Sequence, residues 1–260
     1  MPQDNSGREL KQLFKDIDTS YTKGEKRNLI ADFKRLLKIT NVTYEAEYRQ
    51  RGLAKLPTII ASNHYVRPLF VRKSLFTTLD SMVTSAIITL SLSKLTKNKI
   101  TWVVKNNIRG DLLFYDNFIK KTQLTAISCY DFIGDSDGYP FGAYQKWLEY
   151  LKAGYCIALY PEGKISRVLQ NQKDGFEKKL KHLLTEKLKF QILPVSIWSH
   201  GDYFKVTFGK VIKPNCSPDK IAHETMINIA LGLPSQLRGD YAKSVGEYGR
   251  SSNLNFGNYR

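Results

Sequence analysis

The sequence lacks the long apolar run that a membrane-spanning helix requires. Its most apolar stretch, Met82 to Leu95, contains several Ser and Thr and reaches only about two-thirds of the ~20 residues that span a bilayer. A signal-peptide pattern is missing as well, because Met1 to Gly7 is polar and leads into Lys-rich sequence. We therefore expect a cytoplasmic protein whose contact with a membrane, at its inner face, is peripheral.

Cysteine and acidic residues are also scarce. The three cysteines, Cys129, Cys156 and Cys216, stand at no metal-ligand spacing, so we expect no metal site and assign them as small apolar side chains in a reducing compartment. Asp and Glu number 24 against 40 Lys and Arg, which gives a net charge of +16. This excess predicts an anionic partner, such as a phospholipid surface, the phosphates of coenzyme A, an acidic carrier protein or nucleic acid. Nucleic acid is the weakest of these, because helix-turn-helix, zinc-finger and aromatic stacking signatures are missing.

No Pro- or Gly-rich linker divides the middle of the 260-residue chain, so we expect one domain between two distinct ends. Residues 1–39 are expected to form a basic amphipathic helical segment with five apolar residues at helical spacing: Leu29, Ile30, Phe33, Leu36 and Leu37. That apolar face suits either an anionic bilayer or the protein's own core. Residues 234–260 are rich in Gly, Ser, Asn and Tyr and are expected to be a flexible tail.

Between these ends, residues 40–233 alternate strand-like apolar runs with helical patterns. We expect strands at 42–48, 57–62, 100–105, 124–129, 155–160, 191–198 and 203–212, and helices at 80–94, 141–152, 175–189 and 217–231. This alternation predicts an α/β fold with a mostly parallel central sheet flanked by helices. In such a sheet, ligands lie beyond the carboxyl ends of the strands.

Two of the expected strands end abruptly in polar residues that can do chemistry. The first, Ile59 to Ser62, leads into Asn63 and His64. The second, Ile157 to Tyr160, leads into Pro161-Glu162-Gly163-Lys164 and then, beyond Ile165, into Ser166 and Arg167. A His, an acid, a turn residue, a hydroxyl and two cations at strand ends indicate a pocket at the edge of the sheet.

These motifs, together with the Pro-containing strand Ile192 to Ile197, resemble the glycerolipid acyltransferase family, which includes the lysophosphatidic acid acyltransferases. The similarity covers roughly Thr40 to Pro214. It implies a glycerol-3-phosphate acyltransferase-like fold. It also implies transfer of a fatty acyl group from acyl-coenzyme A or acyl carrier protein to a lysophospholipid hydroxyl, foremost that of 1-acylglycerol 3-phosphate. We expect no cofactor beyond this thioester co-substrate, and an anionic membrane surface as a partner.

The first departure from the family pattern concerns the carboxylate. The family has a His and an Asp separated by four residues, and at the position of that Asp this chain has Leu69. Asp80 opens an apolar stretch that resembles the helix following the family's Asp, so we expect an insertion that leaves Asp80 beside His64 in space. His64 would then be the base that takes the proton of the acceptor hydroxyl, and Asp80 would orient its imidazole. The alternative for Asp80 is an acid that interacts with the dipole of its helix.

The second departure concerns phosphate binding. The family's strand motif with a phosphate-gripping Arg has its best counterpart in the expected strand 124–129, which contains no Arg. By resemblance, Glu162 and Gly163 shape the acceptor site, while a phosphate is held by Lys164, Ser166 and Arg167. The family's Arg sits two positions after the Gly, where this chain has Ile165. The basic stretch from position 67 to 121 supplies further candidates for substrate binding: Arg67, Arg72, Lys73 and Lys105.

Two alternatives to this acyltransferase remain open. One is an acyltransferase with a different acceptor, which the missing Arg favours. The other is a catalytically inactive relative that binds anionic membranes, which the missing Asp favours.

Overall fold

The structure of the protein is a computed structural model that describes residues 6–50, 53, 56–67, 74–105, 129–135, 140–172 and 174–251. Within these residues a seven-stranded sheet has the order β1-β7-β6-β2-β5-β3-β4. Its strands are β1 (Thr43–Tyr48), β2 (Thr58–Ser62), β3 (Ile100–Lys105), β4 (Ile133–Asp135), β5 (Cys156–Leu159), β6 (Gln191–His200) and β7 (Tyr203–Phe208). All neighbouring strands pair in parallel except β6 and β7. The predicted α/β fold with a mostly parallel central sheet is confirmed.

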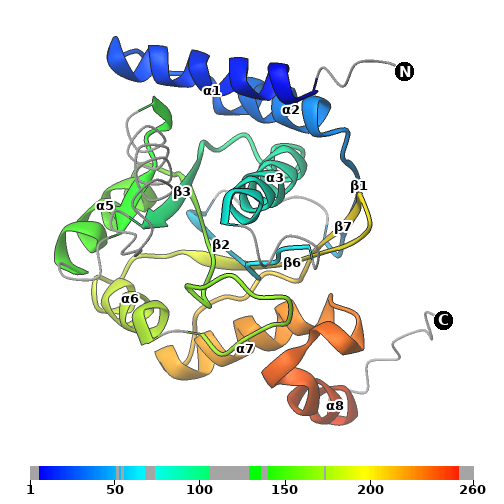
Figure 1. The fold of residues 1–260 in the computed structure, drawn as a ribbon. Helices are drawn as coiled ribbons and strands as arrows, with labels where there is room; N and C mark the ends of the chain where they lie inside the picture. The colour runs from blue at the N-terminus through cyan, green and yellow to red at the C-terminus, as the bar shows by residue number, and fades with distance from the viewer. Residues whose placement is uncertain are drawn as a thin grey trace.

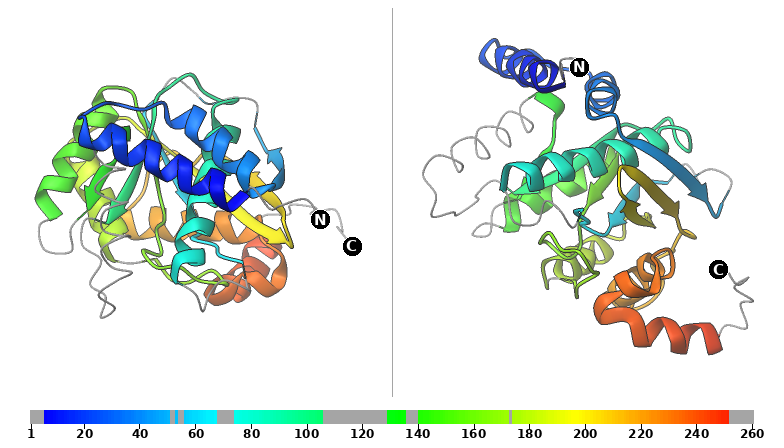
Figure 2. Two further views of the ribbon diagram at one scale, coloured as in Figure 1. Left: turned by 45° about the horizontal axis from the view of Figure 1, so that its top comes forward. Right: turned by 45° about the vertical axis from the view of Figure 1, so that its right-hand side comes forward.

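Helices cover both faces of the sheet. They are α1 (Ser6–Thr22), α2 (Leu29–Thr40), α3 (Ser74–Leu92), α5 (Pro140–Lys152), α6 (Asp174–Thr185), α7 (Pro218–Leu231) and α8 (Ala242–Ser251). Helices α1 to α3 lie on one side of the sheet, and α6 to α8 lie on the other (Figures 1 and 2). Successive side chains of β2 point to opposite faces of the sheet. Ile60 belongs to the core under α2 and α3, and Ile59 belongs to the core that includes α5 to α8.

Because it is covered on both faces, β2 is buried at every residue, as expected for a central parallel strand. It runs beside β5, with Ala61 opposite Leu159. This register brings the segments that follow the two strands to the same edge of the sheet. That edge is where the sequence predicts a pocket.

The apolar face of α2 packs on the protein's own core. Phe33, Leu36, Leu37 and Ile39 are buried, and α2 lies against α3. Of the two predicted surroundings for this face, bilayer and core, the structure contains the second. The helix begins after Asn28, whose side chain accepts a hydrogen bond from the Ala31 amide at 3.1 Å, which is a typical N-cap.

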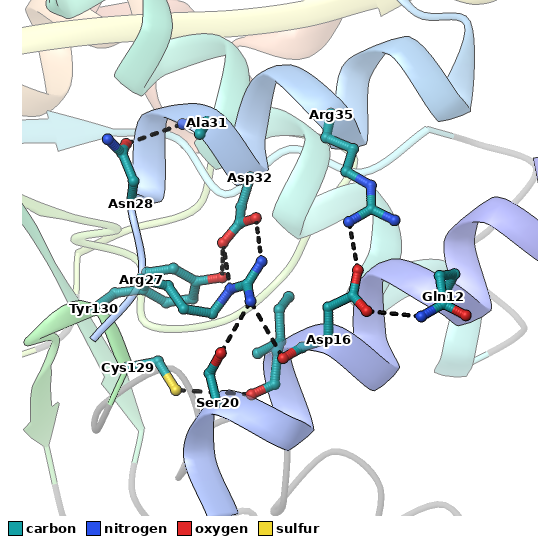
Figure 3. Close-up of polar contacts among 11 residues, drawn as sticks. Gln12, Asp16, Ser20, Arg27, Asn28, Ala31, Asp32, Arg35, Cys129 and Tyr130 are labelled. Atoms are coloured by element: carbon teal, nitrogen blue, oxygen red, sulfur yellow. Dashed lines mark hydrogen bonds and ion pairs between the residues drawn. The ribbon is translucent and has the colours of Figure 1, made fainter. Parts of the chain in front are cut away.

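An ion pair with a buried carboxylate fastens α1 and α2 to residues 129–130 (Figure 3). The Arg27 guanidinium donates two hydrogen bonds of 2.7 Å to the Asp32 carboxylate, and a third of 3.0 Å to Ser20 Oγ. The Tyr130 hydroxyl donates to Asp32 as well, at 2.7 Å. The bond to Asp32 raises the pKa of Arg27, and burial raises the pKa of Tyr130, so each group stays a donor.

The structure differs from the predictions mainly near the chain ends. The N-terminal segment, expected as one helical unit, contains the two helices α1 and α2, and α3 begins at Ser74 rather than near Asp80. The short strand β4 was not predicted, and the expected strand 124–129 lies outside the described residues except for Cys129, which is helical. Cys129 and Cys156 are buried, as expected of small apolar side chains, whereas Cys216 is exposed, contrary to that assignment.

The segment from residue 234 was expected to be flexible. The structure instead has two 3-10 turns, Ser235–Leu237 and Gly239–Tyr241, followed by α8. Tyr241 and Val245 are buried in the core beside α7. Leu237 and Tyr248, partly buried, pack against the same core, so a segment that is poor in aliphatic residues still docks on the domain. Among the helices described, none combines the length and hydropathy needed to cross a membrane.

Candidate functional site

Asn63 fixes the point at which the chain leaves β2. Its side-chain amide donates to the Ile197 carbonyl, and its carbonyl oxygen accepts from the Ile197 amide, both at 2.8 Å. The side chain is buried, so this pair of bonds satisfies polar groups that water does not reach. Asn63 thus joins the end of β2 to the neighbouring strand β6 and sets the direction of His64.

Glu162 joins the segments that follow β2 and β5. Its carboxylate, 1% exposed, accepts hydrogen bonds of 2.7 Å from the His64 amide and from the Gln170 amide. Ser166 adds a third link, because its amide donates to the His64 carbonyl at 3.1 Å. Burial raises the pKa of Glu162 to about 7, although the two amide hydrogen bonds oppose that shift. The predicted proximity of His64 and the Pro-Glu-Gly segment is therefore observed.

The turn after β5 uses its polar groups internally. Gly163 has φ +61°, a conformation that favours glycine, as the predicted sharp turn requires. Its amide donates to the Tyr160 carbonyl at 3.0 Å, so it closes the turn instead of facing an anion. Ser166 Oγ accepts from the Val168 amide at 3.3 Å. Gly163 and Ser166 thus shape this segment in the structure, whereas the sequence predicted that Ser166 would bind a phosphate.

Two contacts hold the His64 ring. It stacks on the Tyr160 ring with centroids 3.9 Å apart and planes 2° from parallel. Its Nε2 lies 3.2 Å from Ser81 Oγ on α3. Burial lowers the pKa of His64 to about 3, so the imidazole is neutral at physiological pH and able to accept a proton.

Asp80 is close to this site but bonds to Arg67. Its side chain is fully buried, and it accepts hydrogen bonds from the Arg67 amide at 2.6 Å and from Arg67 Nε at 2.7 Å. Burial raises the pKa of Asp80, against the opposing effect of Arg67. The site therefore contains Asp80 as well as His64. The described hydrogen bond to the ring, however, comes from the next residue, Ser81, because successive helical residues point about 100° apart.

Arg67 lies inside this network, whereas the sequence predicted it as a phosphate ligand. Its guanidinium pairs with Asp80 and Asp202, and its side chain is 14% exposed. Lys164 and Arg167 are exposed, as a binding role would require. Lys105 is the last residue of β3. The remaining candidates, Arg72 and Lys73, lie outside the described residues.

Sequence reasoning missed Ser81 and Tyr160. The available signals were the position of Ser81 next to Asp80 and a Tyr where the family signature has Phe. Within the described part of the chain, three or more His, Cys, Asp or Glu side chains that could hold a metal ion do not come together anywhere.

No protein-family model matches this sequence, and no curated protein matches it significantly. Among solved structures, the chain is similar to the 1-acyl-sn-glycerophosphate (LPA) acyltransferase PlsC from Thermotoga maritima. The sequence identity is 14% and the TM-score 0.48, over 93% of this chain and 87% of that one. At this distance, any assignment of function has to come from the residues of the site itself.

Proposed function

We propose that the protein is an acyltransferase that moves a fatty acyl group from an acyl thioester to the hydroxyl of a lysophospholipid, with His64 as the general base. One observation carries the proposal. A neutral imidazole stands at the carboxyl end of β2, and its backbone is bound to Glu162 at the end of β5. This is where a parallel α/β sheet binds its ligands.

The chemistry requires little more than a positioned base. His64 takes the proton of the acceptor hydroxyl as its oxygen attacks the thioester carbonyl carbon. The carbon–sulfur bond then breaks, and the thiolate leaving group receives the proton from the imidazolium. Glu162 contributes by holding the His64 backbone, not by contacting the reacting atoms.

The acceptor we propose is 1-acylglycerol 3-phosphate. Arg67 is engaged by two acids, so the exposed pair Lys164 and Arg167 is the better candidate for its phosphate. The variant Lys164→Glu/Arg167→Glu should raise the KM for this acceptor about 10-fold or more, with little change for a lysophospholipid that lacks a terminal phosphate. An equal change for both acceptors would indicate a different acceptor class.

We further propose that the protein works at an anionic membrane surface, on the cytoplasmic side, with acyl-coenzyme A or acyl carrier protein as donor. The support is the net charge of +16, which draws a protein to anionic lipid. Binding to anionic vesicles should weaken with added salt because screening shortens the range of these attractions. Vesicle binding that does not respond to salt would contradict this part of the proposal.

The deciding experiment is a thioester-release assay with acyl-coenzyme A or acyl carrier protein and a panel of lysophospholipids. His64→Ala should lower kcat by about 100-fold or more, while His200→Ala, which changes an exposed histidine at the end of β6, should retain full activity. No turnover by the wild type with any donor and acceptor, together with tight binding to anionic vesicles, would instead identify an inactive membrane-binding relative.

A further inference from the structure

The imidazole of His64 is held by a hydroxyl and an aromatic ring. Ser81 Oγ lies 3.2 Å from Nε2 at the edge of the ring. The Tyr160 ring covers one face of the imidazole, nearly parallel and 3.9 Å away. Together these contacts restrict both the rotation and the tilt of the imidazole.

Tyr160 is anchored to the same helix that carries Ser81. Its hydroxyl lies 2.7 Å from Ser85 Oγ and 3.4 Å from Thr84 Oγ1. These hydroxyls lie within about one turn of Ser81 along α3. Helix α3 therefore sets both the edge contact and the face contact of the His64 ring.

The nearby carboxylate serves a different partner. Asp80 accepts two hydrogen bonds from Arg67, on another side of α3 from Ser81. The other acid at the site, Glu162, binds the backbone amide of His64 and not its ring. Asp80 thus binds Arg67, and Glu162 binds the backbone amide of His64. Neither of these sets of hydrogen bonds involves the imidazole ring.

We propose that Ser81 and Tyr160 are the positioning residues of His64, and that His64 acts as a base without Asp80 or Glu162 bonded to its ring. The catalytic part of this inference rests on the proposed acyltransferase function. The Ser81 hydroxyl can donate to Nε2 or accept from it, and we expect this hydrogen bond to hold the ring in one of its two tautomers. The electron-rich face of Tyr160 stabilises the imidazolium that forms when His64 accepts the hydroxyl proton.

The first test does not depend on activity. The protein has 4 histidines, so nitrogen-15 NMR of histidine-labelled protein, assigned with His64→Ala, can report the tautomer of His64. We expect a single tautomer in the wild type and in Ser81→Thr, which keeps the hydroxyl, and a mixed or exchanged tautomer in Ser81→Ala. Ser93→Ala, which removes an exposed hydroxyl just beyond the end of α3, is the matched control. Unchanged His64 signals in Ser81→Ala would overturn the role of Ser81.

The second test is kinetic. Ser81→Ala should lower kcat about 10-fold to 100-fold with the KM of the acceptor unchanged, and Ser81→Thr should recover most of that loss. Tyr160→Phe keeps the stacked ring and should lose less activity than Tyr160→Leu, provided that both variants melt as cooperatively as the wild type. Wild-type kcat in folded Tyr160→Leu would overturn the role of Tyr160.

The two proposals fail in different ways. A wild type that shows no turnover, but in which Ser81→Ala changes the tautomer of His64, would remove the proposed function and support the positioning by Ser81. An active wild type that loses activity in His64→Ala but not in Ser81→Ala would support the proposed function and remove the positioning role of Ser81.

Discussion

Two Arg–Asp pairs, each with a buried acid, link separate segments of this molecule, and their surroundings differ. Arg27 and Asp32 are five positions apart, form a bidentate pair, and share it with Ser20 and Tyr130. Arg67 and Asp80 join the segment after β2 to α3. The first pair ties the N-terminal helices to residues 129–130, away from His64. The second lies beside His64, and its acid precedes the residue that contacts the imidazole.

The same ionic chemistry can therefore support a scaffold or shape a site, depending on the neighbours of each pair. Asp32 faces only groups that fasten helices. Asp80 ties α3 to Arg67, one residue before Ser81, which contacts the His64 ring. Changes at the first pair should therefore affect stability alone, and changes at the second should affect stability and catalysis together.

The largest expected effect comes from breaking the scaffold pair. Asp32→Ala leaves the guanidinium of Arg27 without its carboxylate in a site where the two side chains are 19% and 10% exposed. We expect the free energy of unfolding to fall by about 3–5 kcal/mol, while kcat per folded molecule stays at the wild-type value. Urea denaturation and the thioester assay on the folded fraction measure the two effects.

Replacing both partners sharpens this prediction. Arg27→Met/Asp32→Leu removes both charges and should cost less stability than Asp32→Ala alone, because no buried charge remains unpaired. Asp16→Ala, at the more exposed pair with Arg35, should cost at most about 1 kcal/mol. A double variant as unstable as Asp32→Ala would show that helix packing, not the unpaired charge, sets the cost.

Breaking the second pair should cost somewhat less stability but also lower activity. In Asp80→Ala, Arg67 keeps Asp202 as a partner, so we expect a loss of about 3 kcal/mol. The rotation of α3 is no longer fixed, so kcat should fall about 10-fold or more. Full activity in a destabilised Asp80→Ala would mean that Ser81 finds His64 without the help of Asp80.

The net effect expected from pH is smaller, because two groups oppose each other. Between about pH 3 and 6.5 the unfolded chain binds a proton at His64 that the folded chain does not, so this group makes stability rise with pH by at most about 1.4 kcal/mol per unit. Glu162, with its pKa raised from 4.5 to about 7, acts in the opposite direction between those values, because there the folded chain binds the extra proton.

The variants His64→Gln and Glu162→Gln separate the two groups in denaturation curves recorded across this pH range. His64→Gln should remove the part of the stability that rises with pH, and Glu162→Gln the part that falls. In the activity profile, the acid limb of kcat/KM should lie well below pH 6.5. An acid limb near pH 6.5, the ordinary pKa of an imidazole, would show that His64 titrates as an exposed side chain does.

The smallest effect is expected at the surface. Lys26 forms an ion pair with Asp131 in which the two side chains are 60% and 52% exposed. Lys26→Ala should change the free energy of unfolding by no more than about 1 kcal/mol, with less effect at high salt. A larger loss would mean that this pair works together with its neighbour Arg27 as one network.

The sequence predicted the sheet well and the ends of the chain poorly. Continuous apolar runs such as Ile59 to Ser62 allow one main interpretation, and the strands β2, β5 and β6 form where they were expected. In helix α1 only Leu13 and Ser20 are buried, so few of its side chains belong to the core. The docking of Tyr241 and Val245 in the core beside α7 depends on contacts between distant residues, which local composition does not report.

By itself, the sequence determined which strand ends meet. Parallel strands that end in Asn63-His64 and Pro161-Glu162-Gly163 bring these motifs to one edge, and the Glu162 hydrogen bond to the His64 amide agrees with that. Only the tertiary structure decided which residue of α3 faces the imidazole. Asp80 and Ser81 are adjacent in the chain, and the choice between them depends on the rotation of a helix about its axis. That rotation is set by packing and by Arg67, and neither is encoded in the spacing of a motif.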